Sequence, residues 1–428
     1  MKEESAFSDA NAAGRQIARL GGRTVEVDVG RVRSYPGLPS EAPDTRGYYA
    51  LAVEELAGAT HVLDVGAGSG NGARILRAAF PHVVALDSAR EAVEFARAHA
   101  PGVTVLRGDA SDRAQLPTAD AAVFVDVLGH ARDPRAVLRA VHARLAPGAL
   151  VLVAEARAYP SQSLRAPARR AFSPRALDAL LEAMGFEVTA RPGETGPFVV
   201  VVARAVAGAD PDALVAAAQA LGQGDVESAM THLDRAAESG QKAVRVDALV
   251  TLGELRLALG DGDGAARAFL AARTADDREP RAAAGLARLT LAMGDRADGV
   301  ALARIAHNLD PTCSSTAYVL ARALDGADDA LKDGALRTAA ALSPDDEGLA
   351  MQFAASSGRR GAAKPGIFAL ERTRRYGDPL PAAFHVLLGE LLLAEGRRQD
   401  AVLEARLAEA VGPREPEVAR LWSRLRTA

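Results

Sequence analysis

Residues 61–76 read HVLDVGAGSGNGARIL. The run HVLDV has the continuous apolar character of a strand that is buried on both faces. It is followed by a turn with Gly66, Gly68 and Gly70 and by a helical stretch that starts at about Gly72. Glycines are needed where the backbone turns sharply and where a ligand must approach without meeting a Cβ. The stretch therefore predicts a strand, a ligand-binding turn and a helix.

The first half of the chain repeats this alternation of a short apolar run and a helical stretch. Apolar runs separated by about 10–15 helical residues are typical of parallel strands that carry helices on both faces. The pattern predicts a Rossmann-like α/β sheet. Six runs show it: 61–65, 83–87, 103–106, 121–127, 149–155 and 198–203.

Acidic residues stand where three of these runs end. Asp64 closes the first strand, Asp87 closes the second, and the segment 106–112 (LRGDASD) brings Asp109 to the end of the third. Because the carboxyl ends of parallel strands lie at one edge of a sheet, we expect three carboxylates beside the glycine turn. Asp87 would then be placed to accept hydrogen bonds from ribose hydroxyls.

Strand signals vanish after about residue 207, and the rest of the chain reads as helix that repeats. The phase markers are 36, 34, 33 and 69 residues apart, and the last gap leaves room for one degenerate unit around 347–380. Small residues recur four and eleven positions after the markers, so stacked helix–turn–helix units are expected. The markers are Asp225, Asp261, Asp295, Asp328 and Arg397.

This second half resembles the tetratricopeptide repeat over residues 211–428, in about six units. The alternative is an irregular helical bundle in which the spacing arises by chance. The resemblance predicts an all-α solenoid. The matching Gly, Ala, Phe, Ala and Pro positions are Gly253, Ala265, Phe269, Ala272 and, one unit later, Pro311.

Composition excludes several classes of protein. The net charge of −4 argues against a protein that coats nucleic acid or an anionic membrane. A single cysteine, Cys313, excludes an intramolecular disulfide framework and a cysteine-cluster metal site, and no metal is expected. No apolar run has the length of a membrane span, and the first 20 residues lack the apolar stretch of a signal peptide. We therefore expect a cytoplasmic protein.

Residues 45–206 resemble the class I S-adenosylmethionine-dependent methyltransferases, in particular the small-molecule branch whose fourth strand reads Asp-Val-Leu-Glu-His. Two positions depart from that pattern, because Gly129 replaces the usual Glu and Ala149 replaces the usual second Gly of Pro-Gly-Gly. The family implies a mostly parallel sheet of seven strands. The matching elements are the turn from Asp64 to Gly70, Asp87, the step Gly108 to Ala110, and the segments 125–134, 143–155 and 171–188.

The resemblance also implies S-adenosylmethionine as the cofactor and a set of residues around it. The turn would pack against the methionine and ribose parts, the acids of the next strands would hold the ribose and the adenine, and residues 126–127 would lie beneath the sulfonium. Asp64 would fix the turn and act on the cationic cofactor through water. The implied set is Asp64, Gly66, Ala67, Gly68, Gly70, Asp87, Ser88, Asp109, Ala110, Asp126, Val127 and Tyr49.

Two residues are candidates for catalysis, and two interpretations of each remain open. His130 follows the fourth strand, where an imidazole is able to remove a proton from the attacking nucleophile. It is equally compatible with a structural hydrogen bond. Glu155, at the end of the fifth strand, is either a substrate contact or a solvated strand end. A dinucleotide enzyme is disfavoured, because Gly72 falls one place beyond the usual third glycine.

These observations predict three parts: an N-terminal helix and lid in 1–44, the cofactor-binding domain in 45–206, and the helical-repeat domain in 207–428. The lid segment, 22–50, is rich in proline and carries arginines and tyrosines, of which Arg46 or Tyr49 is expected to reach the methionine carboxylate.

The function expected is methyl transfer to an O or N nucleophile of a small-molecule, carrier-bound or protein-bound acceptor. The repeats would bind a protein partner or a second copy of the chain, with no specific nucleic acid and no membrane as partner. The alternative is a tetratricopeptide scaffold whose methyltransferase half binds the cofactor but is inactive.

Overall fold

The computed structural model describes residues 45–159, 170–192, 196–206, 212–324, 329–375 and 380–427, and the backbone of 7–8, 15–20 and 23–28. The chain divides into two compact units. The first consists of Met1–Arg157 and Pro174–Ala248, and the second of Ala158–Ser173 and Leu249–Ala428.

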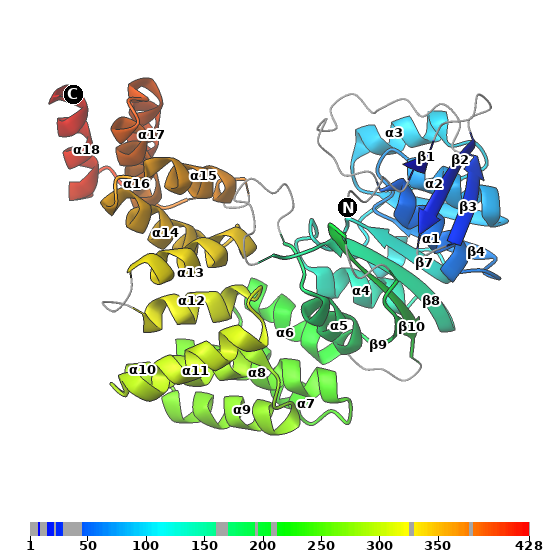
Figure 1. The fold of residues 1–428 in the computed structure, drawn as a ribbon, viewed down its shortest axis with the longest axis horizontal. Helices are drawn as coiled ribbons and strands as arrows, with labels where there is room; N and C mark the ends of the chain where they lie inside the picture. The colour runs from blue at the N-terminus through cyan, green and yellow to red at the C-terminus, as the bar shows by residue number, and fades with distance from the viewer. Residues whose placement is uncertain are drawn as a thin grey trace. The chain divides into compact units, whose positions relative to one another are not determined.

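A seven-stranded sheet forms the centre of the first unit (Figure 1). Its order is β6-β5-β4-β7-β8-β10-β9, in which the first five strands are parallel and the last two are antiparallel to their neighbours. The mostly parallel sheet expected from the sequence is confirmed. The strands are β4 (His61–Val65), β5 (His82–Asp87), β6 (Thr104–Arg107), β7 (Ala119–Val125), β8 (Leu145–Ala156), β9 (Phe186–Ala190) and β10 (Phe198–Ala205).

Helices cover both faces of this sheet, as the apolar character of the strands requires. Val62 and Val123 pack against α1 (Arg46–Glu55) and α2 (Asn71–Ala79). Figure 1 shows α4 (Pro134–His142) and α5 (Pro174–Ala183) on the side of the sheet away from α1 and α2. The remaining elements of this part are α3 (Arg90–His99) and the short 3₁₀ helix η1 (Arg113–Gln115).

The N-terminal segment differs from the prediction. The described backbone there forms a small antiparallel sheet and not the expected helix: β1 (Phe7–Ser8), β2 (Arg15–Leu20) and β3 (Arg23–Asp28). The alternation of apolar and polar residues in 23–28 (RTVEVD) fits a strand with a period of two. Of the expected lid, 22–50, residue 22 and residues 29–44 lie outside the described residues.

From Asp212 onwards the described residues are all helices and their connections (Figure 1). From α9 onwards each helix packs on the next one along the chain, and α10, α12, α14, α16 and α18 also contact alternate helices. This is the arrangement of helix pairs that the repeat predicted. The helices are α6 (Asp212–Gly222), α7 (Val226–Ala237), α8 (Lys242–Ala258), α9 (Gly262–Ala275), α10 (Pro280–Ala292), α11 (Arg296–Leu309), α12 (Ser314–Ala323), α13 (Asp329–Leu342), α14 (Glu347–Arg359), α15 (Ala363–Thr373), α16 (Ala382–Ala394), α17 (Arg398–Val411) and α18 (Pro416–Thr427).

One turn recurs between the two helices of a pair. In the second pair, Gly260 adopts φ +81°, Asp261 donates its N–H to the carbonyl of Arg256 at 2.9 Å, and its carboxylate accepts from the N–H of Gly264 at 2.8 Å. This is a Schellman ending of one helix joined to the N-cap of the next. The same left-handed glycine stands at Gly224, Gly260, Gly294, Gly361 and Gly396.

The helices α14 and α15, joined through Gly361, form the degenerate unit that the spacing predicted around 347–380. Gly361 precedes Ala362, which takes the marker position between α14 and α15 without a side chain that can cap the helix. Asp328, the marker expected one unit earlier, lies outside the described residues.

Close contacts between helices explain the small residues of the repeat. The ring of Phe269 lies where a Cβ at either Gly253 or Gly285 would come within 2.5 Å of it. The tetratricopeptide identity of these units stays a prediction. Among the described residues, no helix combines the length and the apolar character needed to cross a membrane.

Candidate functional site

The turn after β4 is built from three glycines in the left-handed region. The φ angle is +66° at Gly66, +53° at Gly68 and +79° at Gly70, conformations that other residues rarely adopt. A Cβ at Gly66 would lie 2.8 Å from Cγ2 of Val127. At Gly68, by contrast, no described atom beyond the adjacent residues lies within 4 Å of the Cβ position. The backbone at Gly68 is therefore open to a ligand.

Asp87 ties this turn to the next strand. One of its carboxylate oxygens accepts the N–H of Gly68 at 2.8 Å, and the other accepts the N–H of Ala89, also at 2.8 Å. Ala67 is fixed as well, because its N–H donates to the carbonyl of Leu86 at 3.0 Å. Each oxygen of an ionised carboxylate has a second lone pair, so Asp87 is able to accept two further hydrogen bonds from hydroxyl groups of a ligand.

A pocket of about 390 Å³ opens beside Asp87, at the ends of β5 and β6. The backbone N–H of Asp109 donates to Oε1 of Gln115 at 2.9 Å, and Oδ1 of Asp109 accepts from the N–H and hydroxyl of Ser111. Ala110 lies in the same turn. Hydrogen-bonding groups beside an open glycine turn fit an adenosine. The pocket is lined by Ser88, Arg107, Gly108, Asp109 and Gln115.

Asp64 lies beneath the turn and is fully buried. Its Oδ1 accepts a hydrogen bond from the Tyr49 hydroxyl at 3.1 Å, whereas Oδ2 has no hydrogen-bond partner among the described residues. Burial raises the pKa of Asp64 to about 8, and the negative charge of Asp87 adds to the shift. The hydrogen bond from Tyr49 acts in the opposite direction and offsets only part of it.

Tyr49 does not lie where the sequence-based prediction placed it. The side chain is only 5% exposed, and its hydroxyl is engaged with Asp64 rather than directed to an open cleft. Its ring occupies the space of a missing side chain, since a Cβ at Gly72 would lie 2.0 Å from Cζ of the ring. The glycine at the start of α2 is thus explained by the packing of Tyr49, which supports the turn from below.

Asp126, at the end of β7, is the only residue other than glycine with a positive φ among the described residues, at +59°. Such strain persists only where the surroundings hold it, and it is frequent at functional sites. The carboxylate of Asp126 lies 3.5 Å from Nε2 of His130, whose side chain is 45% exposed. This contact with Asp126 is the main cause that raises the pKa of His130 above its usual value.

Glu155 is fully buried at the end of β8. Its Oε1 accepts the N–H groups of Val127 and Leu128 at 3.0 and 2.7 Å, and Oε2 accepts that of Gly129 at 2.9 Å. The solvated strand end considered from the sequence is therefore wrong. Burial raises the pKa of Glu155 to about 7, although the three amides act to lower it.

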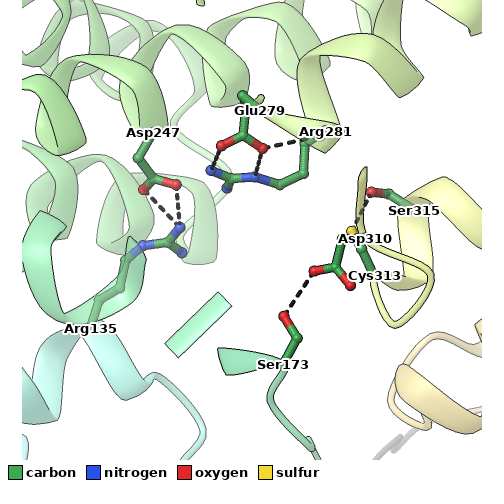
Figure 2. Close-up of polar contacts among 8 residues, drawn as sticks. All are labelled: Arg135, Ser173, Asp247, Glu279, Arg281, Asp310, Cys313 and Ser315. Atoms are coloured by element: carbon green, nitrogen blue, oxygen red, sulfur yellow. Dashed lines mark hydrogen bonds and ion pairs between the residues drawn. The ribbon is translucent and has the colours of Figure 1, made fainter. Parts of the chain in front are cut away.

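The helix after residues 126–130 is anchored within the same compact unit. Arg135 of α4 donates to both carboxylate oxygens of Asp247 on α8, at 2.8 and 3.1 Å (Figure 2). Arg139, one turn later, pairs with Asp212 of α6. These contacts explain why the first unit extends to Ala248, beyond the end of the sheet.

The carboxyl ends of β4, β5, β6 and β7 thus bring together the glycine turn, Asp87, Asp109 and residues 126–130. Sequence reasoning gave no role to Arg107, although it lies in the segment 106–112, and missed Gln115, which belongs to no motif; both line the pocket. It also missed the strain at Asp126, because an aspartate after a strand carries no signal of a positive φ.

Comparison with known proteins finds one family model that matches part of the chain. Residues 38–191 match the family model described as a methyltransferase domain. No curated protein matches the chain.

Several solved structures resemble parts of the chain. The amino pentose methyltransferase CalS10 from Micromonospora echinaspora is 20% identical, with 38% of this chain and 92% of that chain covered and a TM-score of 0.32. A SAM-dependent methyltransferase from Aquifex aeolicus is 21% identical, with 38% and 94% covered and a TM-score of 0.33. The type IV pilus biogenesis factor PilW is 17% identical, with 50% and 100% covered and a TM-score of 0.38. At this level the resemblance says nothing about substrate or partner.

Proposed function

We propose that this chain, whose residues 38–191 match a methyltransferase domain, uses S-adenosylmethionine as its cofactor and methylates an O or N nucleophile. The acceptor would be a small molecule or a group bound to a carrier or a protein. The observation that carries the proposal is the open backbone of Gly68, held by Asp87 beside a pocket of about 390 Å³.

The residues at this edge would hold the cofactor in the following way. Asp87 accepts hydrogen bonds from the ribose hydroxyls through its remaining lone pairs. Ser88 and Asp109, which line the pocket, and Ala110, which follows Asp109, would contact the adenosine. The methionine part would lie along the glycine turn, where Gly68 leaves room for it. When bound, the cofactor would supply a methyl group on a sulfonium: the attacking lone pair would bond to the methyl carbon while the carbon–sulfur bond breaks and the thioether leaves.

The chain's own contribution is to position the acceptor and to remove a proton. His130 is half exposed and, with Nε2 directed to Asp126, is able to accept the proton of the attacking O–H or N–H at Nδ1. The carboxylate of Asp126 at 3.5 Å stabilises the imidazolium that results. Positioning and exclusion of water account for much of the lowering of the barrier in such a displacement.

The helical repeats would bind a protein partner or a second copy of the chain, because stacked helix pairs present extended surfaces. Their first helices hold α4 through Arg135 and Arg139. This observation supports a role close to the catalytic domain, in addition to a role as a scaffold.

The test begins with calorimetric titration of S-adenosylmethionine. Asp87→Asn replaces one acceptor oxygen by an amide that faces a backbone N–H, and we expect about tenfold weaker binding, equal to about 1.4 kcal/mol. The matched control is Asp120→Asn. Asp120 also accepts hydrogen bonds from backbone N–H groups, but it lies at the end of β7 opposite to the proposed cofactor site. Equal affinity in the two variants would refute the assignment of Asp87.

Turnover is then measured as formation of S-adenosylhomocysteine with a panel of phenols, alcohols, amines and carrier-bound acceptors. Product above the level without acceptor supports the proposal. Binding of the cofactor without product from any member of the panel supports the alternative, an inactive domain on a helical scaffold.

A further inference from the structure

Glu155 is a buried acid that grips three consecutive backbone amides. The N–H groups of Val127, Leu128 and Gly129 donate to its two oxygens at 2.7 to 3.0 Å, and the side chain is inaccessible to solvent. A buried N–H without a partner costs about 1–3 kcal/mol. The carboxylate thus satisfies a stretch of backbone that would otherwise carry three such groups.

This stretch lies between the two polar residues at the end of β7. Asp126 precedes it with a strained φ of +59°, and His130 follows it with its N–H bonded to the carbonyl of Val127 at 3.0 Å. A residue with positive φ needs surroundings that impose the conformation. Glu155 supplies them from the neighbouring strand, since it fixes the direction of the peptide groups directly after Asp126.

We propose that Glu155 is a positioning residue of the transfer site: through the amides of 127–129 it holds Asp126 and His130 in their relative geometry at the cofactor edge. The proposal rests on the proposed function for its link to methyl transfer. It replaces the substrate contact considered from the sequence, because the side chain of Glu155 is inaccessible to solvent and both of its oxygens accept backbone amides.

The chemistry of the amides calls for an ionised carboxylate. Three N–H donors converge on two oxygens that have only acceptor capacity when ionised. The charged groups on the segment that faces Glu155 are Asp126 and His130. A proton, or the amide of a glutamine, would place a donor against one of the three N–H groups and would loosen the segment.

The test uses the full chain and the variant Glu155→Gln, with Asp120→Asn as the matched control. Amide hydrogen exchange is followed by mass spectrometry on peptides that cover 126–131 and on peptides from β4. Binding of S-adenosylhomocysteine is measured by calorimetry and folding by the melting temperature. We expect exchange in 126–131 to accelerate about tenfold and the dissociation constant to rise about tenfold. In Glu155→Gln the β4 peptides should exchange as in the wild type. In the control variant exchange in 126–131 and the affinity should be those of the wild type.

Three outcomes overturn the inference. They are unchanged exchange in 126–131, unchanged affinity, and a loss of protection that spreads over the whole sheet. Failure of the wild type to bind S-adenosylhomocysteine would instead refute the proposed function. If Glu155→Gln does not fold, Glu155→Asp carries the test, because it keeps the charge and withdraws it by one methylene group. Local acceleration in that variant supports the positioning role, and wild-type exchange refutes it.

Discussion

The buried carboxylate of Asp64 predicts an unusual dependence of stability on pH. Its pKa is raised from 3.8 to about 8 by burial. The folded protein therefore binds the proton more tightly than the unfolded chain does, and unfolding between these values releases it. The stabilisation is fully present below pH 3.8 and is lost as the pH rises through 8. The shift corresponds to a total of about 6 kcal/mol.

The perturbation that isolates this effect is Asp64→Asn. The amide stays neutral and keeps an acceptor for the Tyr49 hydroxyl. Because the unfolded wild type ionises at Asp64 above pH 3.8 whereas the variant does not, the variant should be more stable than the wild type by about 3 kcal/mol near pH 6. Between pH 6 and pH 8 the wild type loses about a further 2–3 kcal/mol, so the difference from the variant grows over this range. Glu155 titrates in both proteins, and its contribution cancels from the difference.

The assay is urea unfolding followed by hydrogen exchange of the β4 peptides, because the single tryptophan, Trp422, belongs to the other compact unit. The control is Tyr49→Phe, which removes the hydrogen bond that lowers the pKa of Asp64 and should extend the loss of stability to higher pH. A difference between wild type and Asp64→Asn that is the same at about pH 6 and about pH 8.5 would refute the reasoning.

Two further predictions concern glycine and a missing cap. Gly68→Ala and Gly148→Ala both place a Cβ in open space at a positive φ, so each variant should lose about 1 kcal/mol in free energy of unfolding. Only Gly68→Ala should weaken the binding of S-adenosylmethionine, by about tenfold or more in calorimetry. Equal affinity would contradict the assignment of the turn. Ala362→Asp should supply the cap that α15 lacks and stabilise the second unit by about 1 kcal/mol. Trp422, which packs on the same apolar cluster, reports this in fluorescence-detected unfolding.

The strand positions and the repeat were predictable because they rest on local patterns. Apolar runs located the central strands, and the left-handed glycines of the solenoid follow from Gly-Asp pairs such as Gly260 and Asp261. The match of residues 38–191 to a methyltransferase domain agrees with the resemblance that the motifs indicated.

The contacts made across the sheet were not predictable from these patterns. Tyr49 and Asp64 are 15 residues apart, and no pattern in the sequence identifies them as partners. Only the packing of α1 on the sheet brings the hydroxyl of Tyr49 within 3.1 Å of the carboxylate of Asp64. Glu155 has the sequence context of any strand end. Its function as an acceptor for 127–129 depends on the pairing of β7 with β8, which aligns Val125 with Ala154.

The dipeptide Gly-Asp shows why a motif needs its context. In the solenoid, Gly260 has positive φ and the following Asp261 caps the next helix, so the pair ends one helix and starts another. Gly108 and Asp109 have the same letters at the end of β6, but Gly108 lies outside the left-handed region. A Cβ there would meet Oε1 of Gln115 at 2.7 Å, so this glycine is required by close packing against the side chain that binds the Asp109 amide. The first pair closes a turn by itself, whereas the second shapes a pocket. The role of the pair depends on the element before it, which is a helix in the first case and a strand in the second.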